Sequence, residues 1–277
     1  MEYKALYEMG VKQLKEAGIE EASLDARLLL EETCGTGRND LLAHGDRQVA
    51  QELSDRYMSR IEERKRHIPL QHILGYQEFM GLRFKVTPGV LIPRQDTETL
   101  VEEVMRYLND GMRILDLCTG SGCILLSLLR YSNSCQGLGS DLSAQALEVA
   151  RENAGNLSLN AEFVQSDLFE KIEGKFEIIV SNPPYIPSGE IPTLMEEVRD
   201  HDPLMALDGG EDGLSFYREI VKSAGRYLYP GGRLFLEIGC EQGAAVSALM
   251  EKAGYGEVTV SQDLAGLDRV VSGRYAG

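Results

Sequence analysis

An apolar run leads directly into a glycine-rich turn in Ile114-Leu115-Asp116-Leu117-Cys118-Thr119-Gly120-Ser121-Gly122. Its first four residues have the character of a buried strand, and the apolar run Cys123 to Leu129 predicts a helix directly after the turn. Glycines in such a turn let the backbone approach a ligand closely and adopt angles that other residues avoid. The stretch therefore predicts a strand, a tight turn and a helix, the unit that is repeated in doubly wound α/β sheets.

Strands and helices continue to alternate after this unit. Further strands are predicted at 138–141, 163–164, 178–180 and 234–238, and a final pair at 257–260 and 269–272. The intervening helices are predicted at 143–153, 214–228 and 244–253, with Pro230-Gly231-Gly232 closing the second of these. This alternation predicts a mostly parallel sheet with helices on both faces.

The segment before residue 76 has a different, helical periodicity. Ser23 is a plausible N-cap of one helix, and a later helix is predicted from Val49 to Arg66. The basic run at its end, Arg64-Lys65-Arg66, is interpreted as favourable charge near a helix C-terminus, and nucleic-acid contact is the alternative. We predict a helical domain over residues 1–75, a connector over 76–94 and a catalytic domain over 95–277.

Two local features are predicted between the helical and alternating segments. A hairpin is expected within Phe79 to Val86, and Asp96 is expected to cap a helix that runs to about Leu108. The neighbouring Arg94, Thr97 and Glu98 are expected either to frame a ligand or to serve as helix caps and ion-pair partners.

Composition and charge restrict the class of protein. With 43% hydrophobic and 26% charged residues, the chain has the composition of a globular domain. No signal pattern or membrane-length apolar run is present, so a cytoplasmic location is expected. Residues 1–75 carry 11 basic and 14 acidic side chains, so −13 of the net charge of −16 falls on residues 76–277. That charge disfavours binding to duplex DNA.

The five cysteines and four histidines form no spacing typical of a metal site. The cysteines are scattered and include no CxxC pair, so neither zinc nor a disulfide framework is expected. No metal ligand is predicted.

A second motif, Asn182-Pro183-Pro184-Tyr185, follows the predicted strand Phe176 to Val180. The asparagine side chain offers an amide oxygen as acceptor, and the two prolines stiffen the backbone around it. The tyrosine ring adds a flat wall. This combination is suited to gripping a planar NH2 group, whereas a proline-rich turn without function is the structural alternative.

The glycine turn and the two strand ends that follow it predict a nucleoside-binding site. Asp141 ends the second strand, where its carboxylate can accept from both hydroxyls of a ribose, or else cap the next helix. Asp167 ends the third strand, where it can hold an adenine amino group. The turn lacks the G-x-G-x-x-G spacing of dinucleotide folds, which favours S-adenosylmethionine because that cofactor has no pyrophosphate. The predicted cofactor-binding residues are Cys118, Thr119, Gly120, Ser121, Gly122, Asp141, Asp167, Leu168, Phe169 and Asn182.

With these motifs in this order, the chain resembles the peptide chain release factor N5-glutamine methyltransferases. The resemblance covers nearly the whole chain, and includes Pro69 to Gly75, Pro88 to Arg94 with Asp96-Thr97-Glu98, the glycine turn, Ser181 to Ile186, and Asp263 to Gly266. It implies a class I S-adenosylmethionine-dependent methyltransferase domain, Rossmann-like with a seven-stranded sheet, behind a small helical domain that binds the release factor. Two departures are Gln95, where the family often has proline, and Leu168, where some members have tryptophan.

The resemblance implies methyl transfer to the glutamine of the Gly-Gly-Gln loop of release factors, with S-adenosylhomocysteine as the product. Asn182 and the Pro183 carbonyl are expected to accept from the substrate amide, and Pro184 and Tyr185 to complete the substrate site. The alternatives are an N6-adenine methyltransferase acting on DNA or RNA, a non-catalytic binding module and, last, a nicotinamide oxidoreductase. No membrane or direct nucleic-acid partner is expected.

Overall fold

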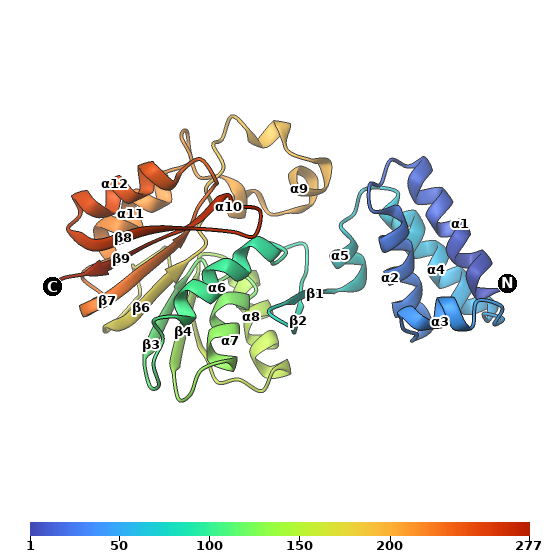
Figure 1. The fold of residues 1–277 in the computed structure, drawn as a ribbon, viewed down its shortest axis with the longest axis horizontal. Coiled ribbons are helices and arrows are strands. Elements are labelled where there is room, and N and C mark those ends of the chain that lie inside the picture. The colour runs from blue at the N-terminus through green and yellow to red at the C-terminus, as the bar shows by residue number, and fades with distance from the viewer. The chain divides into compact units, whose positions relative to one another are not determined.

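The computed structural model describes residues 1–277, which form two compact units (Figure 1). The smaller unit contains Met1–Gly75 and Met195–His201, and the larger contains Tyr76–Leu194 and Asp202–Gly277. The chain therefore enters the smaller unit twice. No helix is long and apolar enough to cross a membrane.

The smaller unit is helical. Its first segment contributes α1 (Tyr3–Glu16), α2 (Ala22–Cys34), α3 (Arg38–Ala43), α4 (Gln51–Arg64) and α5 (Leu70–Leu74), and its second contributes α9 (Glu196–His201). Tyr57 and Ile61, one turn apart on α4, are fully buried in its core. The predicted cap at Ser23 is wrong, because α2 begins one residue earlier, at the buried Ala22.

The end of α4 departs from a simple solvated charge run. Arg64 is buried, and its Nε donates to Asp25 Oδ2 at 2.7 Å while Nη2 donates to Glu197 Oε1 at 2.5 Å. Nη1 also donates to the carbonyl of Ile68 at 3.2 Å. These contacts occupy Arg64 within the unit, so this residue does not provide a free basic surface for nucleic acid.

The larger unit begins with a hairpin of β1 (Tyr76–Phe79) and β2 (Leu82–Lys85), whose turn is Met80-Gly81. Both turn residues have positive φ, 50° and 69°, which is the geometry of the tight turns favoured in hairpins. The hairpin thus starts three residues before the predicted stretch at Phe79. Phe79 and Phe84 pack into the core of the larger unit.

The sheet confirms the predicted fold class. Its strands are β3 (Arg113–Leu117), β4 (Gln136–Asp141), β5 (Glu162–Gln165), β6 (Phe176–Ser181), β7 (Leu228–Glu237), β8 (Tyr255–Gln262) and β9 (Asp268–Tyr275). They lie in the order β5-β4-β3-β6-β7-β9-β8, parallel from β5 to β7 and antiparallel at β9 and β8 (Figure 1).

Helices cover both faces because successive strand residues point to opposite sides. Ile114 and Ile178 pack in one core with α6 (Glu98–Met105) and α7 (Cys123–Arg130). Leu115 and Ile179, their neighbours along the strands, pack in the other core with α11 (Ser215–Ala224) and α12 (Gly243–Lys252). The remaining long helix, α8 (Ala144–Asn156), connects β4 to β5.

Two predictions of local structure are wrong in detail. A 3-10 helix, η1 (Gln95–Thr97), precedes α6, and Asp96 makes no cap but lies 3.3 Å from Arg269. The helix α11 ends at Ala224, and Pro230-Gly231-Gly232 lies within β7. The stretch 186–213, for which no elements were predicted, contains η2 (Ile191–Thr193), α9 and α10 (Leu204–Leu207).

The strand order places β3 beside β6 at the centre of the sheet, where the chain reverses its direction of winding. Leu117 pairs with Ser181, and the Ser181 hydroxyl donates to the Leu117 carbonyl at 2.8 Å. The glycine turn and the Asn-Pro-Pro-Tyr motif therefore leave the sheet side by side, at the position where doubly wound sheets bind ligands.

Candidate active site

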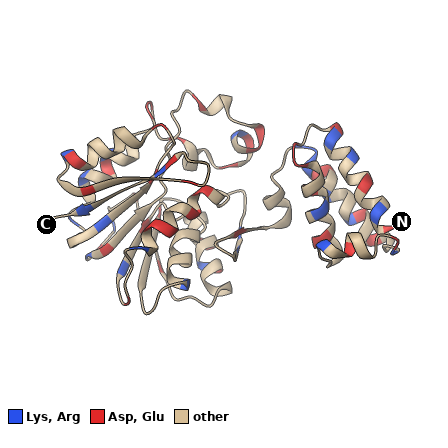
Figure 2. Ribbon diagram, in the orientation of Figure 1, with Lys and Arg blue, Asp and Glu red and all other residues tan.

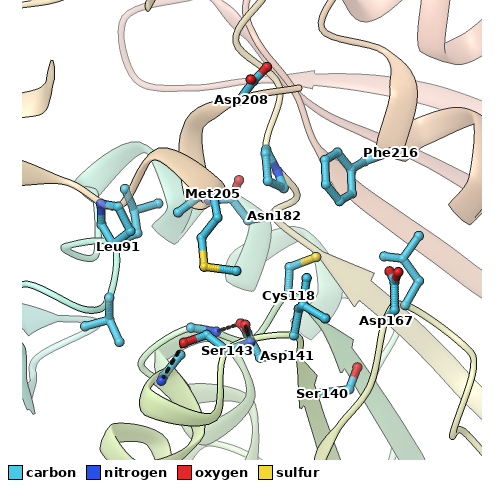
Figure 3. Close-up of a pocket in the computed structure, with 18 of the residues that line it drawn as sticks. Leu91, Cys118, Ser140, Asp141, Ser143, Asp167, Asn182, Met205, Asp208 and Phe216 are labelled. Atoms are coloured by element: carbon cyan, nitrogen blue, oxygen red, sulfur yellow. Dashed lines mark hydrogen bonds between the residues drawn. The ribbon is translucent and has the colours of Figure 1, made fainter. Parts of the chain in front are cut away.

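A pocket of about 380 Å³ lies beyond the carboxyl ends of β3, β4, β5 and β6 (Figure 3). Its size lies in the range of small-molecule sites. It is lined by Gly89, Val90, Leu91, Cys118, Gly120, Ser140, Asp141, Leu142, Ser143, Ala146, Ser166, Asp167, Leu168, Asn182, Pro184, Pro203, Met205, Ala206, Asp208, Gly210, Ser215 and Phe216.

The glycine turn reaches the pocket through alternate residues. Cys118, Gly120 and Gly122 have φ of 57°, 55° and 81°, so every second residue is left-handed. Cys118 and Gly120 line the pocket. A Cβ on Gly122 would lie only 3.3 Å from Ala150 Cβ, so the third position allows close packing of turn and helix. Left-handed geometry at a cysteine is a strain typical of functional sites.

Two predicted turn residues support the turn from behind. Thr119 and Ser121 are buried and do not line the pocket. The Thr119 hydroxyl donates to Asp116 Oδ2 at 2.6 Å, which anchors the turn to its strand. Burial raises the pKa of the Asp116 carboxyl to about 7.

Asp141 is fixed by backbone donors on both carboxylate oxygens. The N–H of Gly120 donates to Oδ2 at 2.9 Å, and the N–H of Ser143 donates to Oδ1 at 2.8 Å (Figure 3). Burial raises the pKa of Asp141, and these bonds oppose the rise. The cap of α8 is Ser143, whose hydroxyl accepts from the Ala146 N–H at 3.1 Å. Asp141 is therefore not the N-cap, and its carboxylate lines the pocket.

The loop after β5 brings Asp167 and Leu168 to the pocket but not Phe169. Phe169 is buried and stacks on Tyr227 with ring centroids 4.7 Å apart. Ser166 shapes this loop, because its hydroxyl donates to the Leu168 carbonyl and accepts from the Lys171 N–H, each at 3.0 Å.

The Asn-Pro-Pro-Tyr segment divides between lining and support. Asn182 and Pro184 line the pocket, whereas Pro183 is buried and Tyr185 packs against the core. Burial raises the pKa of Tyr185 to about 12. The Tyr185 carbonyl accepts from Gln242 Nε2 at 2.9 Å, which fixes the segment's exit. Asn182 Nδ2 donates to Thr97 Oγ1 at 3.4 Å.

Of the three residues expected near the site from the preceding segment, only Thr97 contacts Asn182 in this way. Arg94 pairs with Asp202, and Glu98 Oε1 accepts from the Met80 N–H at 2.6 Å. These two contacts are an ion pair and a hairpin anchor within the larger unit.

Other parts of the pocket wall were not predicted from the sequence. In Figure 3, Leu91 and Met205 lie on one side and Phe216 on the other, beside the predicted Asp167, with Asp208 at the top of the view. Met205 is 49% exposed, although it is a large apolar side chain. These residues come from separate loops and helices, and no local motif marks them.

The charges near the pocket are mostly carboxylates. Asp141, Asp167 and Asp208 line it, and no lysine or arginine does. Acidic residues are scattered over both units (Figure 2). No group of three or more His, Cys, Asp and Glu side chains is arranged to hold a metal ion.

Family models match both parts of the chain. The "PrmC N-terminal domain" matches residues 5–75, and the "Methyltransferase small domain" matches residues 84–198.

Curated relatives match over nearly their full length. A "Release factor glutamine methyltransferase" of Agrobacterium fabrum is 42% identical over 95% of this chain and 94% of its own. The protein of the same name from Caulobacter vibrioides is 44% identical over 94% of this chain and 92% of its own.

Solved structures support the fold of the larger unit. A methyltransferase from Pyrococcus furiosus has a TM-score of 0.54 at 20% identity, covering 79% of this chain and 98% of its own. The 16S rRNA N2 G1207 methyltransferase of T. thermophilus has a TM-score of 0.53 at 20% identity, covering 72% of this chain and 49% of its own. At these identities the likeness shows the fold alone.

Proposed function

This chain belongs to the release factor glutamine methyltransferase family, and we propose that it transfers a methyl group from S-adenosylmethionine to the side-chain amide nitrogen, N5, of a glutamine in a peptide chain release factor. The observation that carries the proposal is the placement of Asn182 beside the glycine turn in one pocket, together with family membership. The second product is S-adenosylhomocysteine.

The pocket residues fit the cofactor chemically. Asp141 presents an acidic acceptor suited to the two hydroxyls of a ribose, and Asp167 presents one suited to an adenine amino group. Leu168 and Phe216 add apolar walls for a flat ring. The cofactor supplies the electrophile, a methyl group on a sulfonium.

The protein's remaining task is to position and orient a weak nucleophile. An amide nitrogen is a poor nucleophile because its lone pair is delocalised into the carbonyl. Asn182 Oδ1 and the Pro183 carbonyl accept the two N–H bonds of the substrate amide, which directs the nitrogen lone pair toward the methyl group. Orientation of this kind is worth roughly 7–11 kcal/mol at best, so it can supply much of the catalysis.

Tyr185 supports this arrangement from behind. It packs against the core formed by β6, β7 and α11 rather than lining the pocket, and Gln242 holds its carbonyl. Its role is therefore to fix the Asn182-Pro183-Pro184 backbone and to exclude water from that side.

The finer specificity is proposed from family membership. The acceptor is the glutamine of the Gly-Gly-Gln loop, and residues 5–75, which match the PrmC N-terminal domain, bind the release factor. The enzyme acts in the cytoplasm, where release factors work.

The test is methyl transfer from labelled S-adenosylmethionine to a purified release factor, beside a variant whose loop glutamine is replaced by alanine. Label on the first and not on the second is expected. An adenine-containing oligonucleotide serves as a parallel substrate. Transfer to the oligonucleotide alone would overturn the proposal in favour of an N6-adenine methyltransferase.

A further inference from the structure

The side-chain amide of Asn182 has an acceptor end and a donor end, and only one orientation serves the proposed reaction. In the structure, Nδ2 points to Thr97 and donates to its Oγ1 at 3.4 Å. Oδ1 is thereby left for the substrate. The two ends have nearly the same shape, so packing alone does not choose between them, and the choice depends on what surrounds Thr97.

Thr97 is almost fully buried, with 2% exposure. Its oxygen accepts from Asn182, so its own proton is available to donate to another group. A candidate acceptor is the carboxyl of Glu237 at the end of β7, whose pKa is lowered by the side chains of both Thr97 and Asn182. The three side chains come from η1, β7 and the loop after β6, so the sheet brings them together.

Glu237 is unusual for a core residue. It is 1% exposed, and its Oε2 has no hydrogen-bond partner. A buried acid with an unpaired oxygen costs stability compared with an apolar side chain of similar size. The contribution of Glu237 is therefore not packing, and the side chains that lower its pKa include Thr97 and Asn182.

We propose that Glu237 is a positioning residue: as a carboxylate it can only accept, so it forces Thr97 to donate toward it and Asn182 to turn its NH2 inward, which leaves Oδ1 facing the substrate amide. The proposal rests on the proposed function, because it concerns the grip on that amide. A neutral acid could donate to Thr97 instead, and the chain of hydrogen bonds could then run in either direction.

The pH dependence follows from the surroundings of Glu237. Burial raises its pKa to about 7, opposed by the hydrogen bond with Thr97 and then by the charge of Arg269. Arg269 is itself paired with Asp263, Nη2 to Oδ2 at 3.0 Å. The ionisable groups around the carboxyl, from each element packed against it, are Asp96, Cys123, Tyr185, Tyr217 and Arg269.

Whether turnover rises or falls with pH follows from the raised pKa of Glu237. Above a pH of about 7 Glu237 is ionised and enforces the productive direction, and below it the acid is neutral and does not. Turnover is therefore expected to fall on the acid side of neutrality. Neither an amide nor a sulfonium titrates there.

The decisive variants are Glu237→Gln, Thr97→Val and Thr97→Ser, assayed for methyl transfer to a release factor. For Glu237→Gln and Thr97→Val we expect kcat to fall about 10-fold or more, by analogy with the loss of one oriented hydrogen bond in an active site, while KM for both substrates changes little. Thr97→Ser keeps the hydroxyl and is expected to restore turnover. Glu237→Gln is also expected to lose the acid limb of the pH profile.

Tyr217→Phe is the matched control. The Tyr217 hydroxyl donates to the backbone carbonyl of Glu237 at 2.9 Å, so this variant removes a buried hydrogen bond at the same residue without touching the carboxyl. Wild-type pH dependence is expected. If Glu237→Gln keeps both the wild-type kcat and the acid limb, the proposal is wrong. If Glu237→Gln does not fold, equal turnover of Thr97→Val and Thr97→Ser overturns it.

A second readout needs no release factor. The side-chain NH2 resonances of Asn182, identified by their absence in Asn182→Asp, are expected to shift with a midpoint near pH 7 in the wild type and to stay constant in Glu237→Gln. If the Asn182 resonances of the wild type do not change with pH, the proposed role of Glu237 is wrong. If the Asn182 resonances shift with pH but the enzyme does not methylate release factors, the proposed function is wrong and the proposed role of Glu237 in orienting Asn182 still holds.

Discussion

The backbone N–H of Gly120 donates a hydrogen bond of 2.9 Å to Oδ2 of Asp141, which joins the turn after β3 to the end of β4. Ser143 donates to the other oxygen, so the carboxylate lies in a cradle of backbone donors. The proposed ribose acceptor is thus preorganised, and the two backbone donors favour its charged form against the effect of burial.

Asp141→Asn is expected to weaken S-adenosylmethionine binding about 10- to 100-fold, because an amide has only one acceptor oxygen and its NH2 opposes a backbone N–H. The range corresponds to the loss of a charged hydrogen bond, about 1.5–3 kcal/mol. Calorimetric titration measures the affinity. Glu211→Gln, an exposed acid outside the pocket, is the control and should bind normally.

Asn182→Ala is expected to lower kcat/KM for the release factor about 100- to 1000-fold, as for other oriented groups that act mainly in the transition state. Cofactor affinity should change far less, because other residues supply most of those contacts. The assay is initial-rate transfer of labelled methyl. Asn156→Ala, at the exposed end of α8, controls for loss of an asparagine. Near-normal turnover of Asn182→Ala would contradict the proposed grip.

Gly209→Ala is expected to reduce turnover, since a Cβ there would lie 2.7 Å from the Cα of Tyr185 and 2.8 Å from its carbonyl carbon. The Gly209 N–H also donates to the Ile186 carbonyl at 2.8 Å, so the two segments cannot easily separate. Relief of the clash would move the Asn-Pro-Pro-Tyr backbone.

Gly189→Ala provides the comparison, because no atom lies within 4 Å of a Cβ at this exposed position. Steady-state kinetics and thermal unfolding of both variants are the measurements. Equal kinetics would show that the contact between Gly209 and Tyr185 does not matter for the site.

Stability is expected to fall as the pH rises from about 4 to 7, in part through Asp116. Its folded pKa of about 7 lies above the ordinary value of 3.8, so the folded state binds more protons in this window. The stabilisation is complete below the unfolded pKa and is lost as the pH passes the folded one. Urea unfolding of Asp116→Asn should show a smaller difference between pH 5 and pH 8 than the wild type. An unchanged difference would contradict the shifted pKa.

The sheet was predictable because its strands are short apolar runs separated by clear turn and helix signals. The turn from Cys118 to Gly122 and Asp141 lie at strand ends, where local sequence and topology together indicate a site, whereas Asp167, predicted to end the third strand, lies in the loop after β5. Which residues of each motif line the pocket and which support it from the core could not be predicted. Phe169 and Tyr185 both pack with the same apolar core on one side of the sheet.

The pocket walls and the surroundings of Glu237 could not be predicted, because they are formed by residues far apart in the sequence. Met205 and Phe216 belong to segments whose local pattern indicates only helix or loop. In the sequence, Glu237 is only a polar residue at the end of an apolar strand. The residues next to it in the chain do not indicate that Thr97 lies close to it. Such contacts arise only when the strands are aligned.

The central pairing of β3 with β6 has a consequence for folding. Leu117 and Ser181, which bond across these strands, are separated by 64 positions, whereas Gly120 and Asp141, which bond beside them, are separated by 21. Closure of so long a loop is slow compared with local turn formation. The part of the site that holds Asp141 can therefore form early. Asn182 reaches the site only when β3 pairs with β6. A partly folded chain in which β3 and β6 are not paired lacks a complete active site. Methyltransferase activity is therefore a measure of whether the sheet has formed completely.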